Sequence, residues 1–89
     1  MARMEMSAVP ASRTVPAETS AEAYYQLGLM YAAGRTAPVD LVAAQTWFNV
    51  ALARGCRQAA AHRQELALEM TAEQLARALR EARAFLTRH

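Results

Sequence analysis

Two side chains of this sequence have the chemistry of nucleophiles, bases or metal ligands: the thiol of Cys56 and the imidazole of His62. On one helix a spacing of six residues would place them about 120° apart, which does not suit zinc ligands. The other histidine, His89, is the last residue of the sequence, so no cluster of cysteine and histidine forms. A nucleophilic cysteine also needs a neighbouring histidine as base. We therefore expect Cys56 to be a small residue in a turn and His62 to be a packing residue.

Paired carboxylates and phosphate-binding loops, two further signs of catalysis, are weak or missing in this sequence. Glu65 and Glu69 are one helical turn apart among other charged residues, a pattern typical of a solvated helix face. Gly28, Gly34 and Gly55 stand alone, and no glycine-rich loop for phosphate is present. Because no set of acid, base and nucleophile can be assembled, we predict no enzyme activity, no cofactor and no metal ion.

Four arginines near the end of the chain could bind nucleic acid or another anionic surface: Arg77, Arg80, Arg83 and Arg88. However, Glu73 and Glu81 each stand four residues from Arg77, a spacing that favours salt bridges along one helix. Binding along a phosphate backbone needs several unpaired cations, and stacking on bases needs exposed aromatic rings between them. The pattern favours a solvated helix face, and an electrostatic binder remains the alternative.

Composition predicts one small domain that is rich in helix. The chain has 89 residues, of which 54% are hydrophobic by count, and many of these are alanines, which favour helix but add little to a core. Its ten basic residues are all arginine and its eight acidic residues are interspersed with them, so the net charge of +2 creates no field of one sign. The apolar runs are shorter than the roughly 20 residues that span a bilayer. We expect a cytoplasmic protein without a signal peptide.

The first part of the chain differs in character from the rest. Residues 1–17 contain two prolines, no helical periodicity and no continuous apolar stretch of the kind found in a secretory signal. We expect residues 1–17 to be an arm that is disordered or is ordered only by a partner, and residues 18–89 to form the folded domain.

Two helices are predicted after this arm, joined by a short loop at residues 35–37. The first begins near residues 18–20, with Thr19 or Ser20 as the N-cap, and ends at Gly34. One of its faces carries Ala23, Leu27, Met30 and Tyr31 with Tyr24 beside them, and the opposite face carries Glu22, Tyr25, Leu29 and Ala32. A helix that is apolar on two sides must be covered on both.

The second helix is predicted to begin with Pro38 at its first position and Asp40 in its first turn, and to end at Gly55. Trp47 is the expected anchor of this hairpin, because its ring offers the largest area for burial. The apolar stripe of the helix is expected to comprise Leu41, Ala44, Trp47, Phe48, Ala51 and Leu52, and its polar side Gln45, Thr46 and Asn49.

Two more helices are predicted in the last part of the chain. The third spans about residues 57–70 with a narrow stripe of Ala59, Leu66 and Met70. Thr71 and Gln74 have the spacing of a capping box, which opens a last helix. One face of that helix is expected to carry Leu75, Ala78, Leu79, Ala82, Phe85 and Leu86.

The spacing of small, large and glycine residues across the two central helices follows one pattern: Ala23, Leu27, Gly28, Tyr31, Gly34, Asp40, Ala44, Trp47, Ala51, Gly55 and Ala59. This pattern resembles the Sel1-like repeat, a relative of the tetratricopeptide repeat, and the segments WFNVALARG and MTAEQLARA are similar to those of small bacterial Sel1-like proteins. The chain departs from the family at Thr36, where a glycine is usual, and at Arg63 and Gln64, which replace Leu-Gly in a second repeat. The resemblance implies an all-α fold, a short α-solenoid of one helical hairpin followed by a two-helix C-terminal cap.

The same resemblance implies a protein-binding function and no catalytic residues. Roughly three repeat hairpins are usually needed for stability, because one hairpin cannot bury both of its faces. This chain has one good repeat, so a partner protein or a second copy could supply the missing surface. We expect a small adaptor or an accessory subunit docked on a larger complex. The candidate contact residues are Tyr25 and Leu29, with Tyr24, if they lie uncovered on the first helix. The alternative is that the cap helices bury them.

Overall fold

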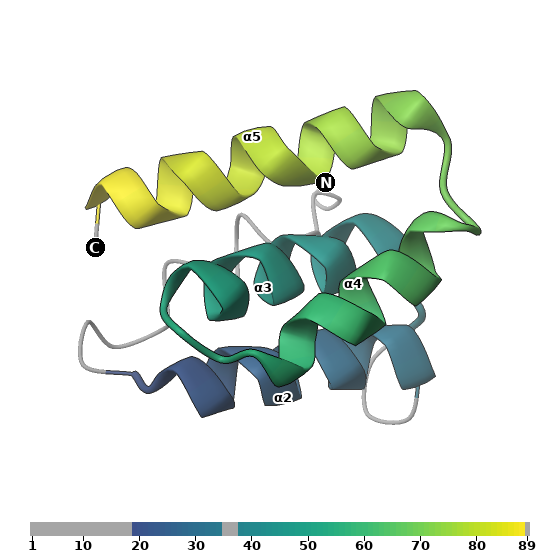
Figure 1. Cartoon of the computed structure of the whole chain (residues 1–89). Helices are drawn as coiled ribbons and strands as arrows, with labels where there is room; N and C mark the ends of the chain where they lie inside the picture. Colours follow the sequence, from purple (N-terminus) through teal and green to yellow (C-terminus); the bar gives the residue numbers. More distant parts are fainter. Residues whose placement is uncertain (1–18, 35–37, 89) are drawn as a thin grey trace.

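The computed structural model describes residues 19–34 and 38–88, and these residues form an all-α fold of four helices without strands (Figure 1). The helices are α2 (Ala21–Ala33), α3 (Leu41–Ala53), α4 (Gln58–Ala67) and α5 (Ala72–Arg88). The expected all-α class and the expected order of a hairpin followed by two helices are thus confirmed. The arm at residues 1–17, the loop at residues 35–37 and His89 lie outside the described residues. Stacking of repeats into a solenoid stays a prediction.

Helix α3 is the centre of the fold, because α2, α4 and α5 all pack against it (Figure 1). Every residue from Val42 to Ala51 is buried, including Gln45, Thr46 and Asn49. The three residues expected to form the polar side of the helix are thus buried like those of its apolar stripe. The physical reason is that the two C-terminal helices cover the side of α3 that a lone hairpin would leave in water.

The ends of the helices follow mostly from local capping. Ser20 is the N-cap of α2, with its Oγ accepting from Ala23 N at 3.2 Å, and Gly34 closes the helix at a φ of 71°. Such a φ is in the left-handed region that glycine adopts without strain. Thr71 and Gln74 form the expected capping box before α5: Gln74 N donates to Thr71 Oγ1 at 3.1 Å and Thr71 N donates to Gln74 Oε1 at 2.9 Å.

The start of α3 differs from the expectation. Asp40 is the N-cap rather than a residue of the first turn, with Oδ1 accepting from Ala43 N at 3.0 Å, and Pro38 lies outside the helix. The carboxylate cap satisfies a free amide of the first turn, which proline at the first position would not do. Helix α4 is also shorter than expected, because it ends at Ala67 and not near Met70.

Helices α2 and α3 approach closely at Gly28, as the pattern of small residues predicts. A Cβ atom built on Gly28 would overlap the ring of Phe48 in α3. Ala44, Ala51 and Ala59 are completely buried, so small side chains do lie at the helix contacts. The spacing of glycine and alanine in the sequence therefore marks the places where backbones come together.

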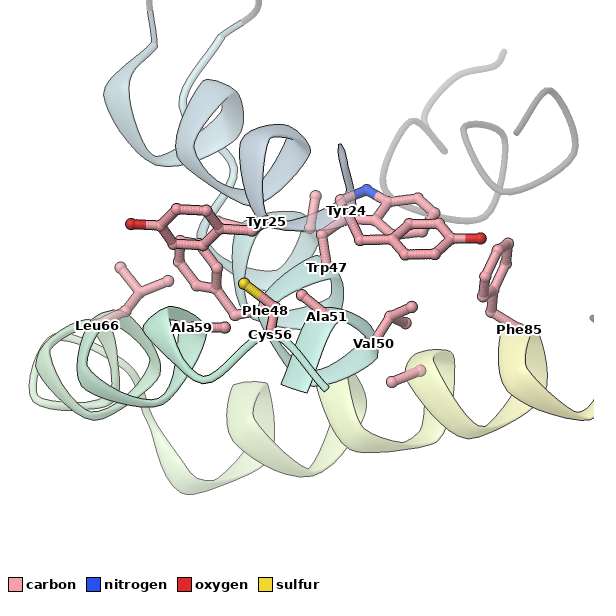
Figure 2. Packing of buried hydrophobic residues seen from close by; sticks show 13 residues of the cluster. Tyr24, Tyr25, Trp47, Phe48, Val50, Ala51, Cys56, Ala59, Leu66 and Phe85 are labelled. Carbon is pink, nitrogen blue, oxygen red and sulfur yellow. The ribbon is translucent and has the colours of Figure 1, made fainter. Parts of the chain in front are cut away.

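Two groups of aromatic side chains occupy opposite sides of the core (Figure 2). The first, here called the Trp47 cluster, joins α2, α3 and α5 through Tyr24, Trp47 and Phe85. The second, the Phe48 cluster, joins α2, α3 and α4 through Tyr25, Phe48 and His62. Each of α2 and α3 thus contributes one of two adjacent residues to each cluster.

None of the helices within residues 19–34 and 38–88 combines the length and the apolar character needed to cross a membrane.

Candidate functional site

The tyrosines of α2, which the sequence offered as partner contacts, lie inside the fold. Tyr24 is completely buried and Tyr25 is 8% exposed, while Leu29 is half-buried against the core. The premise that Tyr25 is uncovered was wrong, because α4 lies against it: the Tyr25 hydroxyl and His62 Nδ1 are 3.2 Å apart. The structure shows the other arrangement, in which a cap helix buries Tyr25. A role of these three residues in binding stays a prediction.

The residues with catalytic potential have structural surroundings. His62 packs edge-on against Tyr25 and lies beside Phe48, which confirms it as a packing histidine. Cys56 is buried in the turn between α3 and α4, where its N–H donates to Ala51 O at 2.9 Å. Within the described parts of the chain, no three His, Cys, Asp or Glu side chains are grouped closely enough to hold a metal ion.

A groove runs along α3 between α4 and α5. It consists of two adjoining hollows of about 250 Å³ and 300 Å³, both of which are lined by Asn49, Arg63 and Leu79. We call this feature the α4/α5 groove. Its full lining is Gln45, Asn49, Leu52 and Ala53 from α3, Arg63, Gln64 and Ala67 from α4, and Leu75, Leu79, Ala82, Arg83 and Leu86 from α5.

The floor of the groove holds a short chain of polar contacts between α3 and α4. Gln45 Nε2 donates to the backbone oxygen of Arg63 at 3.1 Å, and Arg63 Nη1 donates to Asn49 Oδ1 at 3.1 Å. The oxygen Gln45 Oε1 is buried and has no hydrogen-bond partner among the described residues. These contacts hold the Arg63 guanidinium at the groove and explain why polar residues are tolerated inside α3.

Helix α5 contributes both leucines and an arginine to the wall and rim of the groove. Leu79 is 42% exposed, which makes it one of the few large apolar side chains with much accessible area. Arg83 is exposed, and neither Arg63 nor Arg83 forms an ion pair with any described residue. By contrast, Arg77 lies 3.7 Å from Glu81 on the same helix, as its spacing predicted. The arginines of α5 therefore differ in what they have left to offer a ligand.

Sequence reasoning missed the polar residues of this groove. Gln45 and Asn49 lie four residues apart on one side of an otherwise apolar helix, and Arg63 stands where the repeat pattern expects leucine. These two irregularities were interpreted separately, as the polar side of one helix and as a departure from the repeat pattern. Considered together they could have indicated that the helix bearing Arg63 covers the polar side of α3.

Comparison of the chain with models of protein families, with curated proteins and with solved structures finds no match. The function must therefore be argued from the groove and the sequence pattern.

Proposed function

We propose that this chain is a protein-interaction module of the Sel1-like type, a small adaptor or accessory subunit that docks on a larger protein through the α4/α5 groove. The observation that carries the proposal is the groove itself, an open concave surface with an exposed leucine at its rim and two arginines that form no ion pair with a described residue. Concave surfaces with an apolar lining and a few placed polar groups are typical of small-molecule sites, and apolar grooves also bind segments of partner proteins.

The side chains of the groove suit a protein-binding site better than an active site. An interface core combines apolar side chains with arginine, and the leucines and arginines of α5 supply both. The described residues provide no general base beside a nucleophile, because His62 is engaged with Tyr25 and Cys56 is buried elsewhere. A structural partner therefore explains the groove with fewer assumptions than a substrate.

Nucleic acid is the less favoured ligand. Arg77 is paired with Glu81, and Phe85, the aromatic residue of α5, is buried in the core. Binding to single strands draws on exposed aromatic rings as stacking platforms, which the described part of α5 does not offer.

The test is affinity capture from native cells with the tagged full chain and two variants that place the same charge at different leucines. Leu79→Glu changes the groove, whereas Leu68→Glu changes an 87% exposed residue outside it. We expect one set of proteins to be captured by the wild type and by Leu68→Glu but lost with Leu79→Glu. Sedimentation of the same samples identifies a second copy of the chain as the partner. Equal capture by all three proteins would contradict the proposal.

A further inference from the structure

We propose that the α4/α5 groove selects a segment of the partner protein that presents a carboxylate next to a large apolar side chain. This inference rests on the proposed function and specifies the chemistry of the partner. It follows from three features of the groove: its unpaired guanidinium groups, the leucines beside them, and the opposite charge on the other side of α4.

The guanidinium groups face the same hollow from two helices. Arg63 belongs to α4 and Arg83 to α5, and both line the hollow of about 250 Å³. Arg63 donates one N–H group to Asn49, and this hydrogen bond orients the Arg63 side chain. A guanidinium carries five such donors. The planar fork of arginine matches the two oxygens of a carboxylate. An acidic side chain or a terminal carboxylate in this hollow would compensate charges that no described residue pairs.

The apolar part of the ligand follows from the other walls of the same hollow. Leu52, Leu79 and Leu86 line it together with the two arginines. A ligand with only a carboxylate would leave these leucines in water, and a purely apolar ligand would desolvate the arginines without compensating their charge. Both requirements are met when an acid and a large apolar side chain are close neighbours in the partner.

The far side of α4 carries the opposite charge. A hollow of about 410 Å³ there is lined by His62, Glu65 and Glu69 together with apolar residues of α2 and α3. An acidic segment is repelled from this hollow and attracted to the α4/α5 groove, so one helix separates two surfaces that discriminate by charge. Because of the charge difference across α4, the groove selects its ligand by charge as well as by apolar side chains.

The experiment is selection of random 12-residue peptides displayed on phage against the full chain, followed by calorimetric titration of the selected peptides. We expect the peptides to carry Asp or Glu beside Leu, Ile, Met or Phe. Arg83→Gln should weaken their binding about tenfold or more, since a charge-assisted contact is lost. Arg80→Gln makes the same change at an exposed position of α5 outside the groove and should change affinity by less than about twofold.

Arg63→Gln serves as a second variant with the same expected loss, and unchanged thermal melting of Arg83→Gln shows that the loss is not unfolding. Selected peptides without acidic residues, or equal effects of Arg80→Gln and Arg83→Gln, would overturn the inference. A selection that yields no peptide also overturns it. In each case the proposed function is judged by the capture with Leu79→Glu alone, so the two failures are distinguishable.

Other occupants give different results in the same titrations. Residues 4–6 of this chain read Met-Glu-Met, and a rise of about tenfold in peptide affinity on Glu5→Gln would show that the chain fills its own groove. Competition by a single-stranded oligonucleotide that depends on Arg83 would show a phosphate site. Association of the chain with itself that Leu79→Glu abolishes would show a second copy. Each of these outcomes overturns the assignment of the groove to an acidic partner segment.

Discussion

The two aromatic clusters on either side of α3 have similar sizes but different chemistry. In the Trp47 cluster the rings of Tyr24 and Trp47 are stacked at 5.7 Å with an angle of 4° between their planes, and Phe85 packs edge-on against both. Tyr24 Oη and Trp47 Nε1 are buried there without a hydrogen-bond partner among the described residues. In the Phe48 cluster, the Tyr25 hydroxyl lies 3.2 Å from His62 Nδ1, and His62 is partly exposed.

Helices α4 and α5 are held against the hairpin of α2 and α3 by different kinds of contact. Helix α5 is attached chiefly through shape and apolar area, since Phe85 packs edge-on against the stacked rings of Tyr24 in α2 and Trp47 in α3. Helix α4 is attached through polar contacts as well, by His62 on one edge and by Arg63 on the other. Apolar burial contributes more to stability than a single hydrogen bond, so we expect the two sides to respond differently to substitution.

The largest effect is expected in the Trp47 cluster. Trp47→Ala removes a fully buried ring that touches two helices and should lower the free energy of unfolding by about 3–5 kcal/mol. In so small a domain this loss can abolish folding. Urea denaturation followed by circular dichroism measures it, with Leu68→Ala as the control. A loss below about 1 kcal/mol would contradict the central place of this ring.

A smaller effect is expected at Gly28 of α2, which lies against the Phe48 ring of α3. Gly28→Ala places a methyl group in the space of the Phe48 ring, and the overpacking should cost about 1–3 kcal/mol. The difference between Gln26→Ala and Gln26→Gly on the exposed side of the same helix measures the helix propensity of alanine relative to glycine. Removal of a helical glycine by itself favours the helix. If Gly28→Ala stabilised the protein, α2 and α3 would not approach each other closely at this position.

The polar contact between α2 and α4 should be worth less again. Tyr25→Phe keeps the ring of Tyr25 and removes the hydroxyl that faces His62, so we expect a loss of about 0.5–1.5 kcal/mol in denaturation experiments. His62→Phe in the same background should then cost little more, because the two substitutions remove one contact. Full additivity of the two losses would indicate that the hydroxyl and the imidazole do not interact.

The smallest effect, that of Tyr24→Phe, tests most directly whether the two aromatic clusters differ in hydrogen bonding. Tyr24→Phe removes a buried hydroxyl that lacks a partner among the described residues, so the free energy of unfolding should stay within about 0.5 kcal/mol or rise. Adjacent tyrosines would then respond differently to the same chemical change. A loss as large as that of Tyr25→Phe would mean that the Tyr24 hydroxyl does have a hydrogen-bond partner.

Local chemistry was the part of the fold that the sequence predicted best. Ser20, Gly34 and the Thr71–Gln74 pair act within a few residues of themselves, so their types alone indicate where helices begin and end. The start of α3 was predicted less well, because Pro38 was expected at its first position and Asp40 in its first turn. The structure favours the residue whose side chain accepts a hydrogen bond from the first turn.

The burial of polar residues and the position of the groove could not be predicted in the same way. Whether Gln45 and Asn49 meet water or protein depends on α4 and α5, which follow later in the chain. Arg63 was interpreted as a defect in a second repeat, although in the structure it bonds to α3. Such tertiary contacts do not leave a periodic signal in the sequence, whereas the close packing at Gly28 does.

The position of Trp47 gives the protein an internal optical probe of one half of its core. It is the one tryptophan of the chain, and its ring packs against Tyr24 of α2 and Phe85 of α5. Its fluorescence therefore reports on the docking of α5, whereas circular dichroism reports on every helix. Coincident unfolding curves from the two signals would show a single cooperative unit. Emission that changes before helicity is lost would show that the packing of α2 and α5 around Trp47 loosens before the helices unfold, without any label or substitution.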